Sequence, residues 1–131
     1  MVAPIGRQLD IQAVHFLRKS ITYADNGKTV DVGYLPAGAT IIRNASGVAV
    51  TTAFNGDSSN VLNVGLSTDS GTNNYGLNLA LGTLGFVALA EAASGLVGSS
   101  DVLIQAAVTS TASASAGAAE IIICYVPDTD A

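Results

Sequence analysis

The chain has 131 residues, a length that supports one domain with one hydrophobic core. Only 11% of the residues are charged and 49% are hydrophobic, whereas an ordinary soluble domain is about a quarter charged. A subunit whose outer faces are covered by neighbouring chains needs few charges, so this composition indicates self-association. A small β-protein with an exterior of serine and threonine is the alternative.

The net charge of −5 comes without a basic stripe that would neutralise phosphates, so nucleic acid is not an expected partner. A membrane span is not expected either, because the longest apolar candidate, LGFVALAEAA, is short and carries Glu91. The start, MVAPIGRQLD, lacks the apolar run of a secretory signal, which predicts a protein made and used in a cytoplasm. The few cations lie mostly in the first third of the chain: Arg7, Arg18, Lys19, Lys28 and Arg43.

Residues 1–20 hold Pro4, Gly6 and most of the cations without clean alternation of apolar and polar residues. We expect them to form an arm that extends from the domain to a neighbour, with a partly ordered terminus of no function as the alternative. A first strand is expected within residues 12–24, where the alternation is poor and three possible cations occur. The remaining residues, 21–131, are expected to form a single β-sandwich domain.

The next segments alternate between apolar and polar residues, the period of a half-buried strand. In the stretch 29–34, for example, Val30, Val32 and Tyr34 are expected on one face. Asn-Gly at 26–27 has the chemistry of a tight hairpin turn, and the polar stretches 55–60 and 68–74 supply side chains that bond their own backbone. The alternating segments are residues 29–34, 48–55, 62–67, 75–82 and 102–109.

Two further segments are also predicted to contain strands. Residues 84–95 read as a strand followed by a turn or a short helix, since Gly82 and Gly85 argue against a long helix. The last strand, 118–126, is apolar on both faces, which predicts a central strand under a loop or a subunit contact. About eight strands separated by regular turns predict an all-β antiparallel sandwich, jelly-roll-like, with another Greek-key sandwich as the rival.

No motif in the sequence indicates a catalytic, cofactor-binding or metal site. His15 is the only histidine, so paired-histidine metal ligation within one chain is excluded, and we expect it to be structural. Cys124 lies in the apolar run EIIICYVP and is expected to be a buried small hydrophobe. None of the 14 glycines belongs to a phosphate-binding loop.

Acidic residues at strand ends deserve a separate test. Asp57, Asp69 and Asp101 each follow or precede an expected strand, and loop carboxylates that cluster bind Ca²⁺ or hydrolyse glycosides. Aspartate in a turn ordinarily caps its own backbone, and we prefer that interpretation. The chain has no tryptophan, and its few aromatic residues are spread one per segment, which disfavours a sugar-binding platform.

The order of the phrases NGKTVDVGYLPAGATI, VAVTTAFNG, LNVGLSTDS and DVLIQAAVTST, with the closing AGAAEIIICYVP, resembles small capsid decoration (cement) proteins and related head structural proteins of tailed bacteriophages. The resemblance covers roughly residues 25–127. It implies a β-rich sandwich that associates as a dimer or trimer on the outside of the major capsid shell and bridges neighbouring capsomers. It transfers no individual functional residue.

The expected function is therefore that of a virion structural protein without enzymatic activity or cofactors. Its expected partners are the major capsid protein and further copies of itself, on the exterior of a capsid assembled in the host bacterial cytoplasm. The alternative is a carbohydrate- or receptor-binding module of a phage tail or fibre, which the polar loops favour and the scarcity of aromatic residues opposes.

Overall fold

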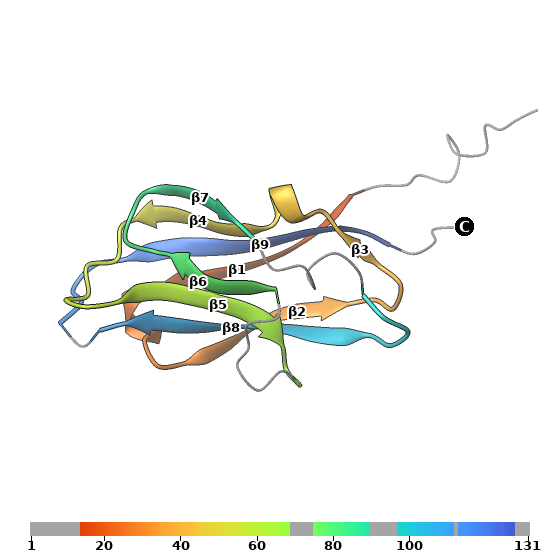
Figure 1. Cartoon of the computed structure of the whole chain (residues 1–131), viewed down its shortest axis with the longest axis horizontal. Coiled ribbons are helices and arrows are strands. Elements are labelled where there is room, and N and C mark those ends of the chain that lie inside the picture. Colours follow the sequence, from red (N-terminus) through yellow and green to blue (C-terminus); the bar gives the residue numbers. More distant parts are fainter. Residues whose placement is uncertain (1–13, 69–74, 90–96, 112, 128–131) are drawn as a thin grey trace, which may run out of the picture.

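The computed structural model describes residues 14–68, 75–89, 97–111 and 113–127. Two antiparallel sheets pack face to face, which confirms the predicted all-β antiparallel sandwich (Figure 1). Two short 3₁₀ turns, η1 (Tyr23–Asp25) and η2 (Arg43–Ala45), interrupt the strands. Within the described residues the nine strands are β1 (His15–Thr22), β2 (Thr29–Leu35), β3 (Thr40–Ile41), β4 (Gly47–Thr52), β5 (Asn60–Leu66), β6 (Gly76–Ala80), β7 (Gly85–Ala88), β8 (Val102–Ser110) and β9 (Ala118–Val126).

Each sheet is organised around one long strand. In the β9 sheet the order is β1-β9-β4-β7, and the two-residue β3 pairs with β9 beyond the end of β4. In the β8 sheet the order is β2-β8-β5-β6. Most consecutive strands, such as β1 and β2 or β8 and β9, lie in opposite sheets, so the chain repeatedly crosses between the layers.

The core lies between the two sheets and follows the period of two. On β9, Ile121 and Ile123 are fully buried, and on β8 Ile104 and Val108 face them from the other layer. Alternate residues of a strand point to opposite faces, so the intervening residues of β9 lie on the outside of the sandwich. The outward Ile122 is half-buried and Cys124 is buried, as the apolar character of both faces predicted.

One end of the sandwich is joined by asparagine side chains. Asn60 Oδ1 accepts hydrogen bonds from Gly56 N–H at 2.7 Å and from the Ser110 hydroxyl at 2.8 Å. Asn26 Oδ1 accepts a hydrogen bond from Ser110 N–H at 2.8 Å. These bonds tie the loops after η1 and β4 to the end of β8, and the Asn60–Gly56 bond confirms the predicted turn chemistry of residues 55–60.

The first turn differs from the expectation. β1 and β2 belong to different sheets, so the Asn-Gly pair at 26–27 does not close a hairpin. Only Gly27 takes a positive φ, +80°, because the chain here crosses between layers through η1. Residues 15–20, which the sequence assigns to the amino-terminal arm, belong to β1, and residues 1–13 lie outside the described residues.

Two side chains lie on faces that simple alternation does not predict. The pairing of β2 with β8 shifts register between Asp31 and Gly33, and Tyr34 is consequently exposed. Leu77 is also exposed, since β5 and β6 shift register between Leu62 and Val64 beside the positive-φ residue Asn78. A bulge of one residue reverses the faces of the residues that follow it.

Candidate interaction surface

The outer face of the β9 sheet carries two exposed phenylalanine side chains, Phe16 and Phe86. Ala49 on β4 has Glu120 of β9 as its register partner on one side and Phe86 of β7 on the other. Phe16 of β1 lies opposite Cys124, so the two phenylalanines mark opposite corners of the face. Phe16 is 57% exposed and Phe86 is 47% exposed. We call this surface, formed by Phe16, Arg18, Ala49, Phe86, Ala88, Glu120 and Ile122, the outer β9 face.

An ion pair lies in the middle of this apolar surface. Arg18 Nε donates to Glu120 Oε2 at 3.0 Å, and a terminal guanidinium nitrogen contacts Oε1 of the same carboxylate. The hydrogen bond and the charge of Glu120 raise the pKa of Arg18. The bidentate geometry joins β1 to β9 and leaves the face without net charge, so a partner surface need not carry charge of one sign.

The β8 sheet combines polar side chains on its outer face with exposed Tyr34 and Leu77. Gln105 Nε2 donates to Asp31 Oδ1 at 2.8 Å, and Thr29 and Thr109 are exposed on the same side. Tyr34 stands at one corner, 67% exposed, with Leu103 as its register partner. Because water solvates this face well, the outer β9 face is the better candidate for burial against another protein.

Cys124 lies on the outer β9 face by alternation with Ile122, yet it is only 3% exposed. Burial raises the pKa of its thiol, which keeps the side chain neutral. The structure thus confirms that Cys124 is a buried small side chain. It adds to the hydrocarbon of the sheet and offers no accessible nucleophile.

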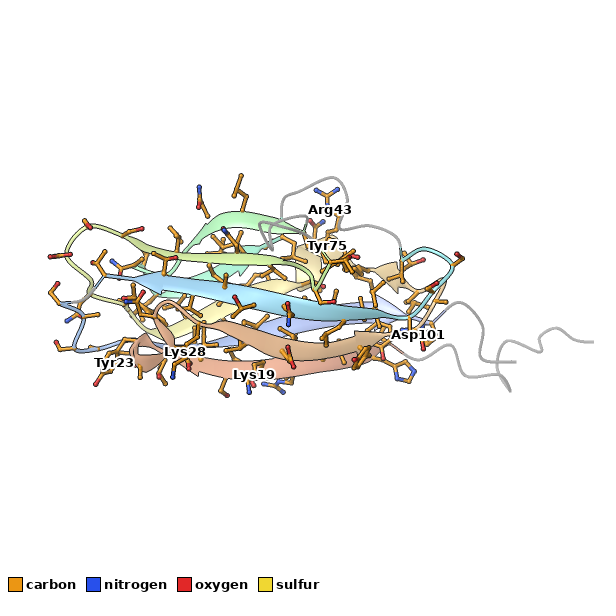
Figure 2. The ribbon with its side chains drawn as sticks, turned by 90° about the horizontal axis from the view of Figure 1, so that it is seen from below. Lys19, Tyr23, Lys28, Arg43, Tyr75 and Asp101 are labelled. Carbon is orange, nitrogen blue, oxygen red and sulfur yellow. The ribbon has the colours of Figure 1, made fainter. Side chains whose placement is uncertain are left out.

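The structure separates the acidic residues that the sequence singled out. Asp101 precedes β8 and accepts a hydrogen bond from Ala37 N–H at 2.9 Å, whereas Asp57 lies beside Thr111, which follows β8. A strand of this length spans roughly 30 Å. Tyr23, whose N–H donates to Gly117 C=O in the connection from β8 to β9, marks the other end of the molecule. Figure 2 shows Asp101 and Tyr23 at opposite ends. Asp69 lies outside the described residues.

These two aspartates cap loops and do not form a pair of reacting carboxylates. The Thr111 hydroxyl, with help from Ser113, holds the pKa of Asp57 below its ordinary value despite some desolvation. Within the described ranges, no three histidine, cysteine, aspartate or glutamate side chains gather as metal ligands. His15 stacks on Tyr125 with ring centroids 5.6 Å apart, a packing contact at the start of β1.

Phe16 and Phe86 were not recognised as a surface from the sequence. The signal lies in their neighbours: Ile21 and the partly buried Leu17 occupy one face of β1, which leaves Phe16 on the other. Val87 likewise packs on the core and Phe86 points outward. No helix in the described part of the chain is long and apolar enough to span a membrane.

Comparison with known proteins finds similarity in fold. No protein-family model matches the chain. No curated protein sequence matches it either. A chain in the acidic stable capsid structure of Helicobacter pylori bacteriophage KHP30 superposes with a TM-score of 0.69 and 15% identity, over 88% of this chain and 89% of that chain. A chain of the cyanophage Pam1 capsid asymmetric unit gives a TM-score of 0.62 and 18% identity, over 87% of this chain and 84% of that chain. At these identities the likeness is one of fold, in both cases to a chain of a phage capsid structure.

Proposed function

We propose that this chain is a structural protein of a tailed-bacteriophage virion. It binds the outside of the major capsid shell as a homodimer or homotrimer and cements neighbouring capsomers. The observation that carries the proposal is the fold shared with chains of two phage capsid structures over 87% and 88% of this chain. The phrases from Asn26 to Pro127 that resemble cement proteins support the same role.

The outer β9 face gives the proposal a physical basis. An interface of standard size buries about 1,600 Å², a little over half of it apolar, and about 25 cal/mol per Å² then gives a gross gain of roughly 20 kcal/mol. Association costs consume much of that gain, so a single contact is moderate in strength. Several symmetric copies that bridge capsomers add their contacts through avidity.

The proposed role needs no reacting group, cofactor or metal ion, and it agrees with the places of the aspartates. Asp57 and Asp101 serve loops at opposite ends of β8. The proposed location is the capsid exterior, after assembly in the host bacterial cytoplasm. Neither nucleic acid nor a membrane is part of the proposal.

We also propose that the sandwich is a jelly roll. A jelly roll has two four-stranded sheets connected as two Greek keys. The order β1-β9-β4-β7 over β2-β8-β5-β6 supports this, because strands from the start, end and middle of the chain alternate across each sheet. β3 and β4 lie on the same side of β9 and together take the place of one interrupted strand.

The experiment is co-sedimentation with heads of the encoding phage that were prepared without this chain. We compare wild type, the double variant Phe16→Ser/Phe86→Ser and the control Tyr34→Ser, which removes a more exposed aromatic ring from the opposite face. Truncating two anchors that each contribute more than about 1 kcal/mol should weaken binding at least tenfold, while Tyr34→Ser should bind like wild type.

Equal binding by all three proteins would remove the outer β9 face from the proposal. A wild-type chain that never sediments with heads would overturn the capsid function itself. If that chain instead bound a glycan array, the carbohydrate- or receptor-binding alternative would replace it.

A further inference from the structure

Apart from the two-residue β3, four of the described strands lie at sheet edges, and three of these four carry features that discourage pairing with another chain. β7 has four residues, β6 has five with a shifted register, and β2 has a bulge between Asp31 and Gly33. β1 differs, because its eight residues pair with β9 in one unbroken register. Short strands and bulges protect edges from association, so β1 is the edge best suited to accept a further strand.

The hydrogen bonds of Cys124 show which side of β9 its backbone faces. Its N–H donates to Ser46 Oγ at 2.8 Å, and its C=O accepts from Ile42 N–H at 2.8 Å. Both partners lie on the side of β3 and β4. Successive residues of a strand direct their backbone groups to opposite sides, so Ile121 and Ile123 face β1.

The same alternation determines which residues of β1 direct their backbone groups to its unpaired edge. Lys19 and Leu17 are the register partners of Ile121 and Ile123, so their backbone groups point to β9. Phe16, Arg18 and Ser20 therefore direct their N–H and C=O groups away from β9. Within the described residues β1 pairs with β9 alone, and these groups are open to an added strand.

A second β1 is a poor partner for this edge. Side chains that share a face must lie opposite one another across an antiparallel pair, which restricts two-fold pairing of β1 to registers centred on single residues. A two-fold register centred on Arg18 or Lys19 places identical cations directly opposite each other. A register centred on Leu17 or Ser20 places two identical cations on the same face, two residues apart along the pair of strands. Like charges on neighbouring strands are destabilising, so a strand that carries a carboxylate fits better.

We propose that residues 8–12 of one copy add a strand to the free edge of β1 in a second copy. Their sequence, QLDIQ, alternates apolar and polar residues. With Asp10 opposite Arg18 in an antiparallel register, Leu9 and Ile11 lie on the core side with Lys19 and Leu17. The proposal rests on the self-association part of the proposed function and is independent of capsid binding.

Charge favours this occupant. Arg18 contacts Glu120 through Nε and one terminal nitrogen, and its planar guanidinium has a further terminal nitrogen to donate. Asp10 supplies the matching carboxylate on the outer face. The added strand also extends the outer β9 face beyond Phe16.

The segment belongs to a second copy because folding back onto its own β1 is unfavourable. In the register that pairs Asp10 with Arg18, Gln12 lies opposite Phe16, and residues 13–15 would have to form the hairpin loop. Those residues are Ala-Val-His, without the glycine, asparagine or aspartate that tight hairpin loops use. His15 is moreover already paired with Tyr125.

The test measures the molar mass of the purified full-length chain by size-exclusion chromatography with light scattering over a concentration series, without capsids. Ser20→Pro removes an N–H that points to the free edge and leaves the pairing with β9 intact, whereas Ser20→Thr is its matched control. Asp10→Lys replaces the carboxylate with a like charge. We expect Ser20→Pro and Asp10→Lys each to weaken self-association at least tenfold and Ser20→Thr to leave it unchanged.

Mixing the two defective variants separates this arrangement from a general loss of stability. The intact segment of Ser20→Pro and the intact edge of Asp10→Lys should restore one contact, so the mixture should form heterodimers. Wild-type association in either variant, no recovery on mixing, or a monomeric wild type would overturn the proposal. If Ser20→Pro unfolds, Asp10→Lys alone decides it. A chain that associates in this way but ignores phage heads overturns the capsid function only.

Discussion

Ser46 completes the hydrogen bonding of β9 where β3 and β4 leave a gap. Its hydroxyl oxygen accepts from Cys124 N–H at 2.8 Å, and its hydroxyl lies 2.8 Å from Ile42 C=O, to which it donates. Ser46 itself is fully buried. The Ser46 side chain thus replaces a missing strand partner of Cys124.

Ser46→Ala should therefore destabilise the fold. The substitution leaves Cys124 N–H buried without its partner, which costs about 1–3 kcal/mol of the free energy of unfolding. Urea denaturation measures the change. Ser20→Ala on exposed β1 is the control and should stay within about 0.5 kcal/mol of wild type. A Ser46→Ala protein as stable as the control would contradict this role for the hydroxyl.

Gly47 allows β4 and β7 to approach closely. A Cβ built at this position would overlap the carbonyl oxygen of Val87, a backbone atom that cannot move aside without breaking the pairing. We expect Gly47→Ala to cost about 1–3 kcal/mol or more. At Gly98 an added Cβ would meet nothing within 4 Å, so Gly98→Ala is the matched control. Equal melting temperatures for the two variants would show that the sheet yields at Gly47.

Asp57 should contribute to the pH dependence of stability. The Thr111 hydroxyl lowers the pKa of Asp57 below its ordinary value of 3.8, so the ionised form favours the folded state. That contribution is present above about pH 4 and is lost as the pH falls through the folded-state pKa. Asp57→Asn should thus be less stable than wild type near pH 6 and approach it near pH 2.

Melting temperatures measured from pH 2 to pH 7 check this prediction. Thr111→Val provides the control, because it removes the same hydroxyl donor and should flatten the acid limb in the same way. An Asp57→Asn protein whose melting temperature runs parallel to wild type at every pH would refute the interpretation.

Cys124 should react slowly in the folded protein. The thiol is buried and its pKa is raised by burial, so attack by a thiol reagent requires local opening of the sheet. We expect labelling by Ellman's reagent to be roughly a hundredfold slower than for an exposed thiol in the Ser20→Cys/Cys124→Ser variant. Comparable rates for the two proteins would mean that the outer β9 face opens readily near β3.

The sandwich was predictable from the sequence because its long strands keep a period of two. Both faces of residues 118–126 are apolar, and β9 is indeed an interior strand of its sheet, between β1 and β4. The faces of Tyr34 and Leu77 were not predictable, since they depend on register shifts in β2 and β6 that arise from pairing with distant strands. The face of a side chain depends on how its strand pairs with its neighbours, and the pattern of one strand alone does not contain that pairing.

The candidate surface was predictable only in part. The sequence shows that the last strand is apolar on both faces, Ile122 included. Phe16 and Phe86, however, come from strands far apart in the chain. Only the register through β9 and β4 places them on one face. The separation of Asp57 and Asp101 was likewise decided by the direction of β8, which no local pattern of the loops reveals.

The most direct test of the proposed function is a cryo-electron microscopy reconstruction of the head of the phage that encodes this chain. We expect the sandwich to sit on the outer surface of the shell between capsomers, with Phe16 and Phe86 buried in a protein contact. A head whose exterior lacks this sandwich, or on which both rings face solvent, would contradict the account.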